Sequence, residues 1–270
     1  MISCNKKYFL NLGITNLSNV KFCDDPLFVE LCEKRPAYNE EFAVYVNEQD
    51  YPKEYLNRAR RLIPIIVDTL WEELNADGEL GTCARISLQL YRMLQEAGFW
   101  CYMIKGALKV EIDSNEKYGF YGLQSTTGSE NKEVGHIWVV APPFKLIDIS
   151  VKRQEYLSSN TNVVNNLLQE QLTYGGYILE DIISPSLLKE WKSAGYEVNM
   201  NNIYCNREGW NFFSDKFRPF KVFEKNVEYR YTPLNIYMVS DELDDIYWHC
   251  NGKSARYIYD NLILPKIQAP

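Results

Sequence analysis

A chain of 270 residues with 46% apolar and 14% aromatic side chains can bury a substantial core, as one large domain or two small ones. Its formal net charge of -7 disfavours a nucleic-acid backbone or an anionic membrane as the main partner, because both attract a basic surface. The sequence contains neither the apolar run of a signal peptide nor a stretch of membrane-spanning length, so we expect a soluble, cytoplasmic protein.

Two helices are predicted in the first hundred residues. Because a proline removes one helical hydrogen bond and clashes with the preceding turn, Pro64 should kink a helix or start a new one, and we place a helix at about residues 64–75. Gly81 and Thr82 precede a second helix, with Thr82 as its N-cap and Gly98 as its stop. This second helix is expected to be buried on one side, along the face formed by Ile86, Leu90, Leu94 and Ala97.

Strands are predicted next along the chain. Residues 100–112 have the aromatic and branched side chains of a strand, and two short apolar runs at 136–140 and 144–151 are read in the same way. The stretch 113–134 between them is polar and rich in Gly and Ser, which is typical of a long loop. We expect this loop to be mobile and to lie near the functional site, because its composition supplies few core contacts.

These elements predict an α+β fold in which the helix that begins near Cys83 packs on an antiparallel sheet. The predicted division is a core with an N-terminal helical part over residues 1–151 and a C-terminal region over residues 152–270. The second region has no assigned role, but its aromatic content indicates that it folds and packs on the core.

The cysteine usage favours free thiols in a reducing compartment over a disulfide framework. The seven cysteines lie far apart, at positions 4, 23, 32, 83, 101, 205 and 250. The sequence has no C-x-x-C pattern and only two histidines, His136 and His249, so neither a metal site nor another cofactor is predicted. His249 adjoins Cys250, but neighbouring residues point apart in a strand, and both are interpreted as structural.

Cys83 is the candidate nucleophile. It falls in the first turn of its predicted helix, where unpaired backbone N–H groups and the positive end of the helix dipole favour a thiolate over a thiol. The alternative is a buried structural cysteine, because free cysteine is among the most buried residue types.

The two short strands after the loop supply a candidate base and a candidate acid. If residues 141–143 close a hairpin, Val140 pairs with Phe144 and His136 then faces Asp148. Opposed residues of an antiparallel pair project to the same side, with Cβ atoms about 5 Å apart, so the carboxylate can orient the imidazole. The alternatives are a core histidine and a strand-end aspartate, and a one-residue slip would place the two side chains on opposite faces.

Together these elements resemble the transglutaminase-like branch of the papain-like cysteine enzymes. The shared features are G-x-C at Gly81 to Cys83, a helix ending in "LQEAGF", the strand "CYMIKGAL", H-x-W at His136 to Trp138, and an aspartate in the next strand. The resemblance covers roughly residues 70 to 150. It implies a papain/transglutaminase-like core.

The resemblance also implies roles for particular residues. The nucleophile, base and orienting acid of that family would fall on Cys83, His136 and Asp148, in the family's order along the chain. For the oxyanion hole, Asn75 and Trp71 are candidates beside the backbone N–H of Cys83. Trp138 is interpreted as a core residue that could instead line the site.

These observations predict a cysteine hydrolase or acyltransferase that acts on a peptide or side-chain amide through a thioester acyl-enzyme. Glutamine crosslinking or deamidation is a second possibility. Arylamine acetyltransferase-like transfer is a third, although the Arg-Gly-Gly run expected before the cysteine is replaced by "GELGTC". From a different class, the chain could be a non-catalytic binding module on the same scaffold. The expected partner is a protein or peptide substrate, with no nucleic acid and no membrane.

Overall fold

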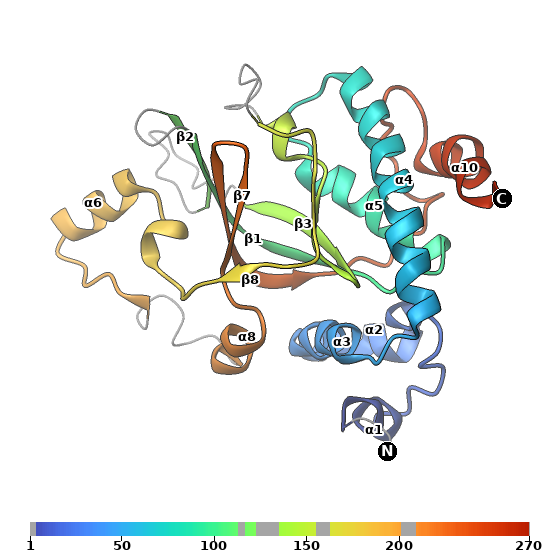
Figure 1. The fold of residues 1–270 in the computed structure, drawn as a ribbon. Coiled ribbons are helices and arrows are strands. Elements are labelled where there is room, and N and C mark those ends of the chain that lie inside the picture. The colour runs from blue at the N-terminus through green and yellow to red at the C-terminus, as the bar shows by residue number, and fades with distance from the viewer. Residues whose placement is uncertain (1–3, 113–116, 123–134, 155–162, 201–208, 270) are drawn as a thin grey trace.

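A curled antiparallel sheet with helices packed on it organises the fold in the computed structural model (Figure 1). The structure describes residues 4–112, 117–122, 135–154, 163–200 and 209–269. Seven strands lie in the order β5-β4-β3-β1-β8-β7-β6, and β2 pairs with β1 outside this path. The strands are β1 (Tyr102–Ile112), β2 (Lys117–Tyr121), β3 (His136–Ala141), β4 (Phe144–Asp148), β5 (Leu167–Gln169), β6 (Thr173–Tyr174), β7 (Phe220–Glu224) and β8 (Val227–Tyr237). The predicted α+β class is confirmed.

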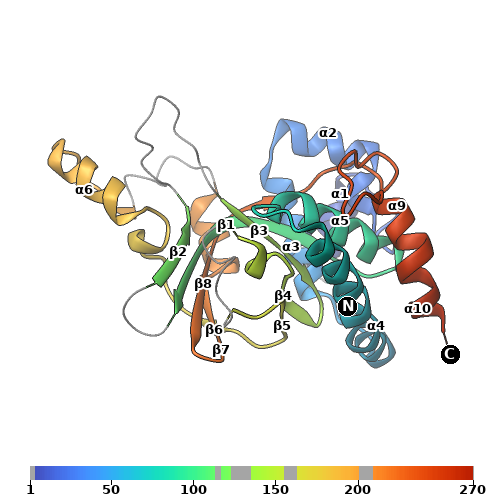
Figure 2. The same cartoon turned by 90° about the horizontal axis from the view of Figure 1, so that it is seen from above.

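The helices gather mainly at one end and on one side of the sheet. They are α1 (Cys4–Asn11), α2 (Pro26–Lys34), α3 (Ala37–Glu48), α4 (Lys53–Asp77), α5 (Cys83–Glu96), α6 (Pro185–Ser193), α8 (Trp210–Lys216), α9 (Ala255–Ile258) and α10 (Leu264–Gln268). Short 3-10 turns cover Phe22–Asp24, Val151–Arg153 and Leu179–Asp181, and a π-helical turn covers Tyr259–Ile263. Seen from above, α6 projects from the sheet on the side opposite α4 and α10 (Figure 2).

Each face of the sheet carries its own hydrophobic core, because successive residues of a strand point to opposite faces. Ile104 of β1 and Trp138 of β3 belong to the core that also contains the side chains of α1–α3 and β8. Met103 and Ile137 belong to the second core, with the apolar sides of α4 and α5. The helix that begins at Cys83 therefore packs on the antiparallel sheet, as predicted.

The central strand β1 contacts three other strands. Its first half pairs with β3 and its second half with β2, while its other edge follows β8 along the whole length. At Gly106 the chains approach closely: an added Cβ would lie 2.2 Å from the backbone oxygen of Thr232 and 2.7 Å from Trp138. Only glycine fits this position, which is paired with His136 on β3.

The predicted start of the first helix is wrong. Helix α4 begins at Lys53, runs through Pro64 and ends at Asp77. Buried residues before and after the proline form one continuous apolar face. Ala59 and Ile63 precede Pro64 on this face, and Ile66 follows it. Burial of this face offsets the hydrogen bond that the proline removes.

The second helix follows its prediction more closely. Helix α5 spans Cys83–Glu96, and Gly98 has a positive φ of 75°, as expected of a helix stop. The four residues assigned to its apolar face are all buried. Thr82 holds the N-cap position, but its side chain makes no capping hydrogen bond.

The predicted hairpin register is wrong. Ala141 pairs with Phe144, so the turn contains only Pro142 and Pro143, and a register shift between Val139 and Ala141 then pairs Val139 with Ile147. Asp148 therefore lies diagonal to His136 and not directly opposite it. Because this shift amounts to two positions, it preserves the face to which each side chain points.

The predicted loop 113–134 is corrected in part. Residues 117–121 form β2, which pairs antiparallel with β1, where no strand was predicted. Residues 113–116 and 123–134 of this stretch lie outside the described residues, so the expectations for their mobility and position stay predictions. Strands β5–β8, from the predicted C-terminal region, belong to the same sheet as β1.

Two searches of the described residues gave negative results. No helix among them combines the length and apolar character needed to cross a membrane. Within the same part of the chain, no group of three or more His, Cys, Asp or Glu side chains is arranged to hold a metal ion.

Candidate active site

Cys83 is the first residue of α5. The first backbone hydrogen bond of the helix runs from Ile86 N–H to Thr82 O at 3.0 Å, so the N–H of Cys83 precedes the helical ladder. Gly81, with a φ of 68°, makes the turn into the helix, and its N–H donates to Arg153 O at 2.8 Å. Cys83 keeps 8% of its surface exposed, which leaves the thiol at the edge of the protein interior.

A contact between α5 and the first residues of β3 fixes the position of this helix start. The Ser87 hydroxyl donates to Ile137 O at 3.0 Å, one helical turn after Cys83. The Cys83 sulfur lies 3.9 Å from the backbone oxygen of Gly135, the residue before His136. The helix start and the strand start therefore meet at the same end of the sheet.

His136 is fully buried and is held by Asp148. The distance between His136 Nε2 and Asp148 Oδ2 is 2.6 Å. Asp148 occupies Nε2, so Nδ1 is the ring nitrogen that remains for the thiol, and Cys83 lies near enough to the imidazole to contribute to the raised pKa of His136. The structure thus brings Cys83, His136 and Asp148 close together, which keeps them as candidates for a nucleophile, a base and an orienting acid.

Both oxygens of Asp148 are hydrogen-bonded. Its Oδ1 accepts from the backbone N–H and the hydroxyl of Ser150, each at 2.9 Å. Its Oδ2 accepts from the Tyr231 hydroxyl at 2.7 Å, in addition to the contact with His136. Gln154 in turn donates to the Ser150 carbonyl at 3.0 Å. Because all the donors come from fixed positions, the carboxylate is held in one orientation.

The His136–Asp148 pair favours its charged form. Burial by itself would lower the pKa of His136, but the Asp148 charge and hydrogen bonds to Asp148 and Cys83 outweigh it and raise the pKa to about 10. For Asp148, burial would raise the pKa, yet the His136 charge and hydrogen bonds from His136, Tyr231 and Ser150 hold it below its ordinary value.

Aromatic rings surround the imidazole. Trp138 is fully buried, with its ring centroid 6.3 Å from that of His136 and 5.0 Å from that of Tyr231. Phe220 stacks on Tyr231 at 5.2 Å on the same face of the sheet. Trp138 therefore fills both roles considered for it, as a core residue and as a wall of the site.

The two upstream candidates for the oxyanion hole contact Arg153. Its guanidinium donates to the backbone and side-chain oxygens of Asn75 at 2.7 and 2.6 Å and lies 5.8 Å from the ring of Trp71. Among the described residues, the hydrogen bond of the Cys83 thiol goes to Gly135 O and not to either of them. The backbone N–H of Cys83 remains the oxyanion donor for which the position is suitable.

The other described cysteines differ from Cys83 in their surroundings. Burial raises the pKa of the thiols of Cys23, Cys32 and Cys250 to about 12, and it raises that of Cys101 well above its ordinary value. Cys205 and the side chain of Cys4 lie outside the described residues.

His249 and Cys250 form no joint site. His249 is exposed, and its Nδ1 contacts the Tyr247 carbonyl at 3.0 Å. Cys250 is fully buried in the core beside α4 and α5, so the two neighbours point apart, as the sequence predicted.

Two residues of the site were missed by the sequence reasoning. Ser150 had a usable signal, since serine two residues after an aspartate is a common partner in a local side-chain hydrogen bond. Tyr231 had none, because it reaches Asp148 from β8, 83 positions further along the chain.

Comparisons with known proteins assign no family to this chain. The chain matched no known protein family, no curated protein and no solved structure.

Proposed function

We propose that the protein is a cysteine-dependent hydrolase or acyltransferase of transglutaminase-like type, with Cys83 as nucleophile, His136 as base and Asp148 as orienting acid. One observation carries the proposal: a cysteine at a helix N-terminus lies beside a buried histidine, with its sulfur 3.9 Å from the preceding residue's carbonyl oxygen, and Nε2 of that histidine lies 2.6 Å from a hydrogen-bonded aspartate. A histidine that served only the core would have no need of a thiol at a helix start beside it.

The proposed reaction proceeds in two steps. His136 Nδ1 takes the proton of the Cys83 thiol, and the sulfur attacks the carbonyl carbon of an amide. The new C–S bond forms as the carbonyl π electrons move to oxygen, and the backbone N–H of Cys83 stabilises the oxyanion. His136 then gives its Nδ1 proton to the leaving amine as the C–N bond breaks, which leaves a thioester on Cys83. In the second step His136 takes a proton from water, whose oxygen attacks the thioester and releases the acid and the free thiol.

Hydrolysis of a peptide or side-chain amide is the first choice of reaction. If an amine replaces water in the second step, the same thioester gives crosslinking, and water acting on a glutamine side chain gives deamidation. Arylamine acetyltransferase-like transfer would use the same three residues with an acyl thioester as donor. All of these reactions pass through the acyl-enzyme, so one test for that intermediate applies to each of them.

The acyl-enzyme can be tested without the natural substrate. With p-nitrophenyl acetate as acyl donor, the wild-type protein should release a burst of p-nitrophenol equal to the protein concentration, and peptide mapping should find one acetyl group on Cys83. The Cys83→Ala variant should show no burst. A matched control is Cys250→Ala, which removes a buried thiol of the described chain and should leave the burst unchanged.

The test also separates an enzyme from a binding module. A non-catalytic scaffold has no reason to keep a thiol that acylates faster than the other cysteines. Equal acetylation of Cys83 and Cys32, which is also only partly exposed, would refute the catalytic assignment.

A further inference from the structure

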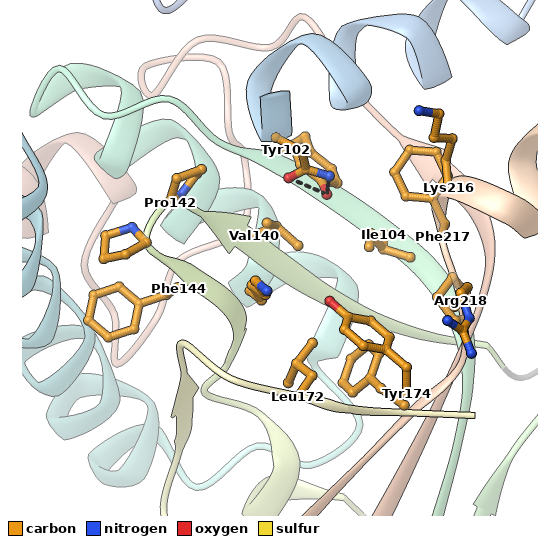
Figure 3. A pocket seen from close by; sticks show the side chains of 15 residues that line it. Tyr102, Ile104, Val140, Pro142, Phe144, Leu172, Tyr174, Lys216, Phe217 and Arg218 are labelled. Carbon is orange, nitrogen blue, oxygen red and sulfur yellow. Dashed lines mark hydrogen bonds between the residues drawn. The ribbon is translucent and has the colours of Figure 1, made fainter. Parts of the chain in front are cut away.

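A pocket of about 370 Å³ opens on the face of the sheet that carries Tyr102, Ile104 and Val140 (Figure 3). It lies between β1, the turn joining β3 and β4, β6 and the segment from α8 into β7. Its volume is within the range of small-molecule sites. Trp138 and Phe220 pack edge to face at 6.2 Å, and Phe220 lines the pocket, so this space is separate from the His136 site.

The interior of the pocket is aromatic. The aromatic side chains that line it are Tyr102, Phe144, Tyr174, Phe217 and Phe220. All except Tyr174 are buried, and Tyr174 is 45% exposed at the mouth. An apolar or aromatic group that enters this space would replace water against ring surfaces, which is favourable.

The mouth of the pocket is cationic. Lys145 and Arg218 are both exposed, and each places its charged group 5.8 Å from the centroid of the Tyr174 ring. Figure 3 shows Arg218 beside Tyr174. Among the described residues, neither side chain forms an ion pair with a carboxylate. Lys216 supplies a third positive charge at the rim, where Glu48 pairs with it at 2.8 Å.

The charge of this pocket differs from that of the whole chain. The formal net charge is -7, yet none of the described residues that line the pocket is Asp or Glu. Two unneutralised cations beside an apolar space attract an anion that also carries an apolar body. Arg218 donates to the Gly175 carbonyl at 3.4 Å, but a neutral apolar ligand would leave both cations without an anionic partner, and a purely polar anion would leave the ring surfaces unused.

We propose that this pocket binds a small aromatic anion, with its ring among Tyr102, Phe217 and Phe220 and its carboxylate or phosphate at Lys145 and Arg218. The exposed cations at the mouth and the buried rings behind them set this orientation. A polar pair lies beside the ring position, where Asn47 Nδ2 donates to the Tyr102 hydroxyl at 2.8 Å. The proposed binding does not depend on whether Cys83 is a nucleophile.

Isothermal titration calorimetry on the full chain tests the proposal with three probes that share one ring system. The probes are 2-naphthoate, 2-naphthyl phosphate and the neutral 2-naphthylmethanol. One or both anions should bind with a stoichiometry of one, and the neutral probe should bind about tenfold more weakly or worse, because it cannot pair with the cations. The stronger of the two anions identifies the preferred oxyanion.

Two variants locate the binding. Arg218→Gln should weaken the better anion about tenfold or more by removing a charged hydrogen-bond donor. Leu172→Trp, at a half-buried position of the lining, should abolish binding of all three probes by filling the space. The matched control Arg60→Gln makes the same charge change at an exposed arginine paired with Glu170, outside the pocket, and should bind as wild type does.

The outcomes are decisive in both directions. Binding that is lost in Arg218→Gln and Leu172→Trp but kept in Arg60→Gln supports the site. Equal affinity for the neutral probe, equal binding by Leu172→Trp, or no binding of either anion overturns it. Because Cys83→Ala should retain full anion binding, failure of this site and failure of the catalytic assignment give different results.

Discussion

Tyr231 donates its hydroxyl at 2.7 Å to the same carboxylate oxygen of Asp148 that lies 2.6 Å from His136 Nε2. One oxygen of Asp148 thus contacts both β3, which carries His136, and β8, which carries Tyr231 and lies beyond β1 in the sheet. The hydroxyl shares the negative charge of Asp148 with the imidazole, so it holds the carboxylate in place and moderates its pull on the proton.

Removing this hydroxyl should loosen the site without dismantling it. Tyr231→Phe should destabilise the protein by about 1.5–3 kcal/mol, the range for a hydrogen bond to a charged group. It should also reduce the rate of Cys83 alkylation, since the imidazole is less firmly oriented. Urea unfolding and iodoacetamide labelling measure the two effects.

Tyr229→Phe is the matched control for Tyr231→Phe. Tyr229 lies two positions earlier on β8 and is equally buried, but its hydroxyl accepts only a 3.4 Å hydrogen bond from Val164 N–H. It should leave the alkylation rate unchanged. An equal loss of rate in both variants would assign the effect to packing and not to the contact with Asp148.

Cys83 should react fastest among the described cysteines near neutral pH. Its thiol lies at the helix start beside His136, whereas burial raises the pKa of the thiols of Cys23, Cys32, Cys101 and Cys250. Substoichiometric iodoacetamide followed by peptide mapping would measure the selectivity.

Two variants test how the Cys83 reactivity arises. His136→Ala should remove most of the selectivity, because the thiol loses its neighbouring imidazole. Asp148→Asn should remove part of it, because the imidazole remains but is poorly oriented. If His136→Ala labels as fast as wild type, the pairing of these residues has no chemical role.

The charged pair should give the protein a characteristic pH dependence of stability. The pKa of His136 is raised in the folded state from 6.5 to about 10, so its contribution is complete below about pH 6.5 and is lost as the pH rises towards 10. The pKa of Asp148 is lowered from 3.8, so its contribution is present above that value and is lost as the pH falls through the folded value.

Urea unfolding of wild type and His136→Gln between pH 4 and pH 10 tests this dependence. The difference in the free energy of unfolding between the two proteins should be largest between pH 3.8 and pH 6.5, the ordinary pKa values of the Asp148 and His136 side chains. It should shrink from pH 6.5 towards 10. His249→Gln, at the exposed second histidine, serves as the control and should follow the wild-type curve. A difference that stays constant across this range would contradict the raised pKa of His136.

Gly106 should not tolerate a side chain. In Gly106→Ala the new Cβ would lie within 3 Å of the Thr232 backbone oxygen and of Trp138, so β8 or the indole must move. We expect a loss of about 1–3 kcal/mol in unfolding free energy, as for overpacked cores, and slower Cys83 labelling because Trp138 contacts the imidazole. Thermal and urea denaturation measure the loss.

Gly176→Ala makes the same change where no atom lies within 4 Å of the added Cβ. This control should stay close to wild type in stability and in labelling. If the two alanine variants behave alike, the close approach of β1, β3 and β8 at Gly106 does not constrain the site.

The sequence by itself determined the local features of this protein: the α5 helix, the buried strand that follows it, and the order Cys83, His136, Asp148. Helical periodicity, a glycine stop and strand composition are properties of short segments, so they can be read without the fold. Even the face shared by His136 and Asp148 follows from sequence, because a register error of two positions leaves the parity of a strand unchanged.

The tertiary structure decided what distant segments do to one another. Because one apolar face is buried along its length, helix α4 continues through Pro64, where the local sequence predicted the start of a helix. Pairing of β8 with β1 brought Tyr231 to Asp148, and the same sheet placed Lys145 and Arg218 against one ring although 73 positions separate them. Such contacts arise from strand order and sheet curvature, which depend on the free energy of the whole core, and no short segment of the sequence encodes that free energy.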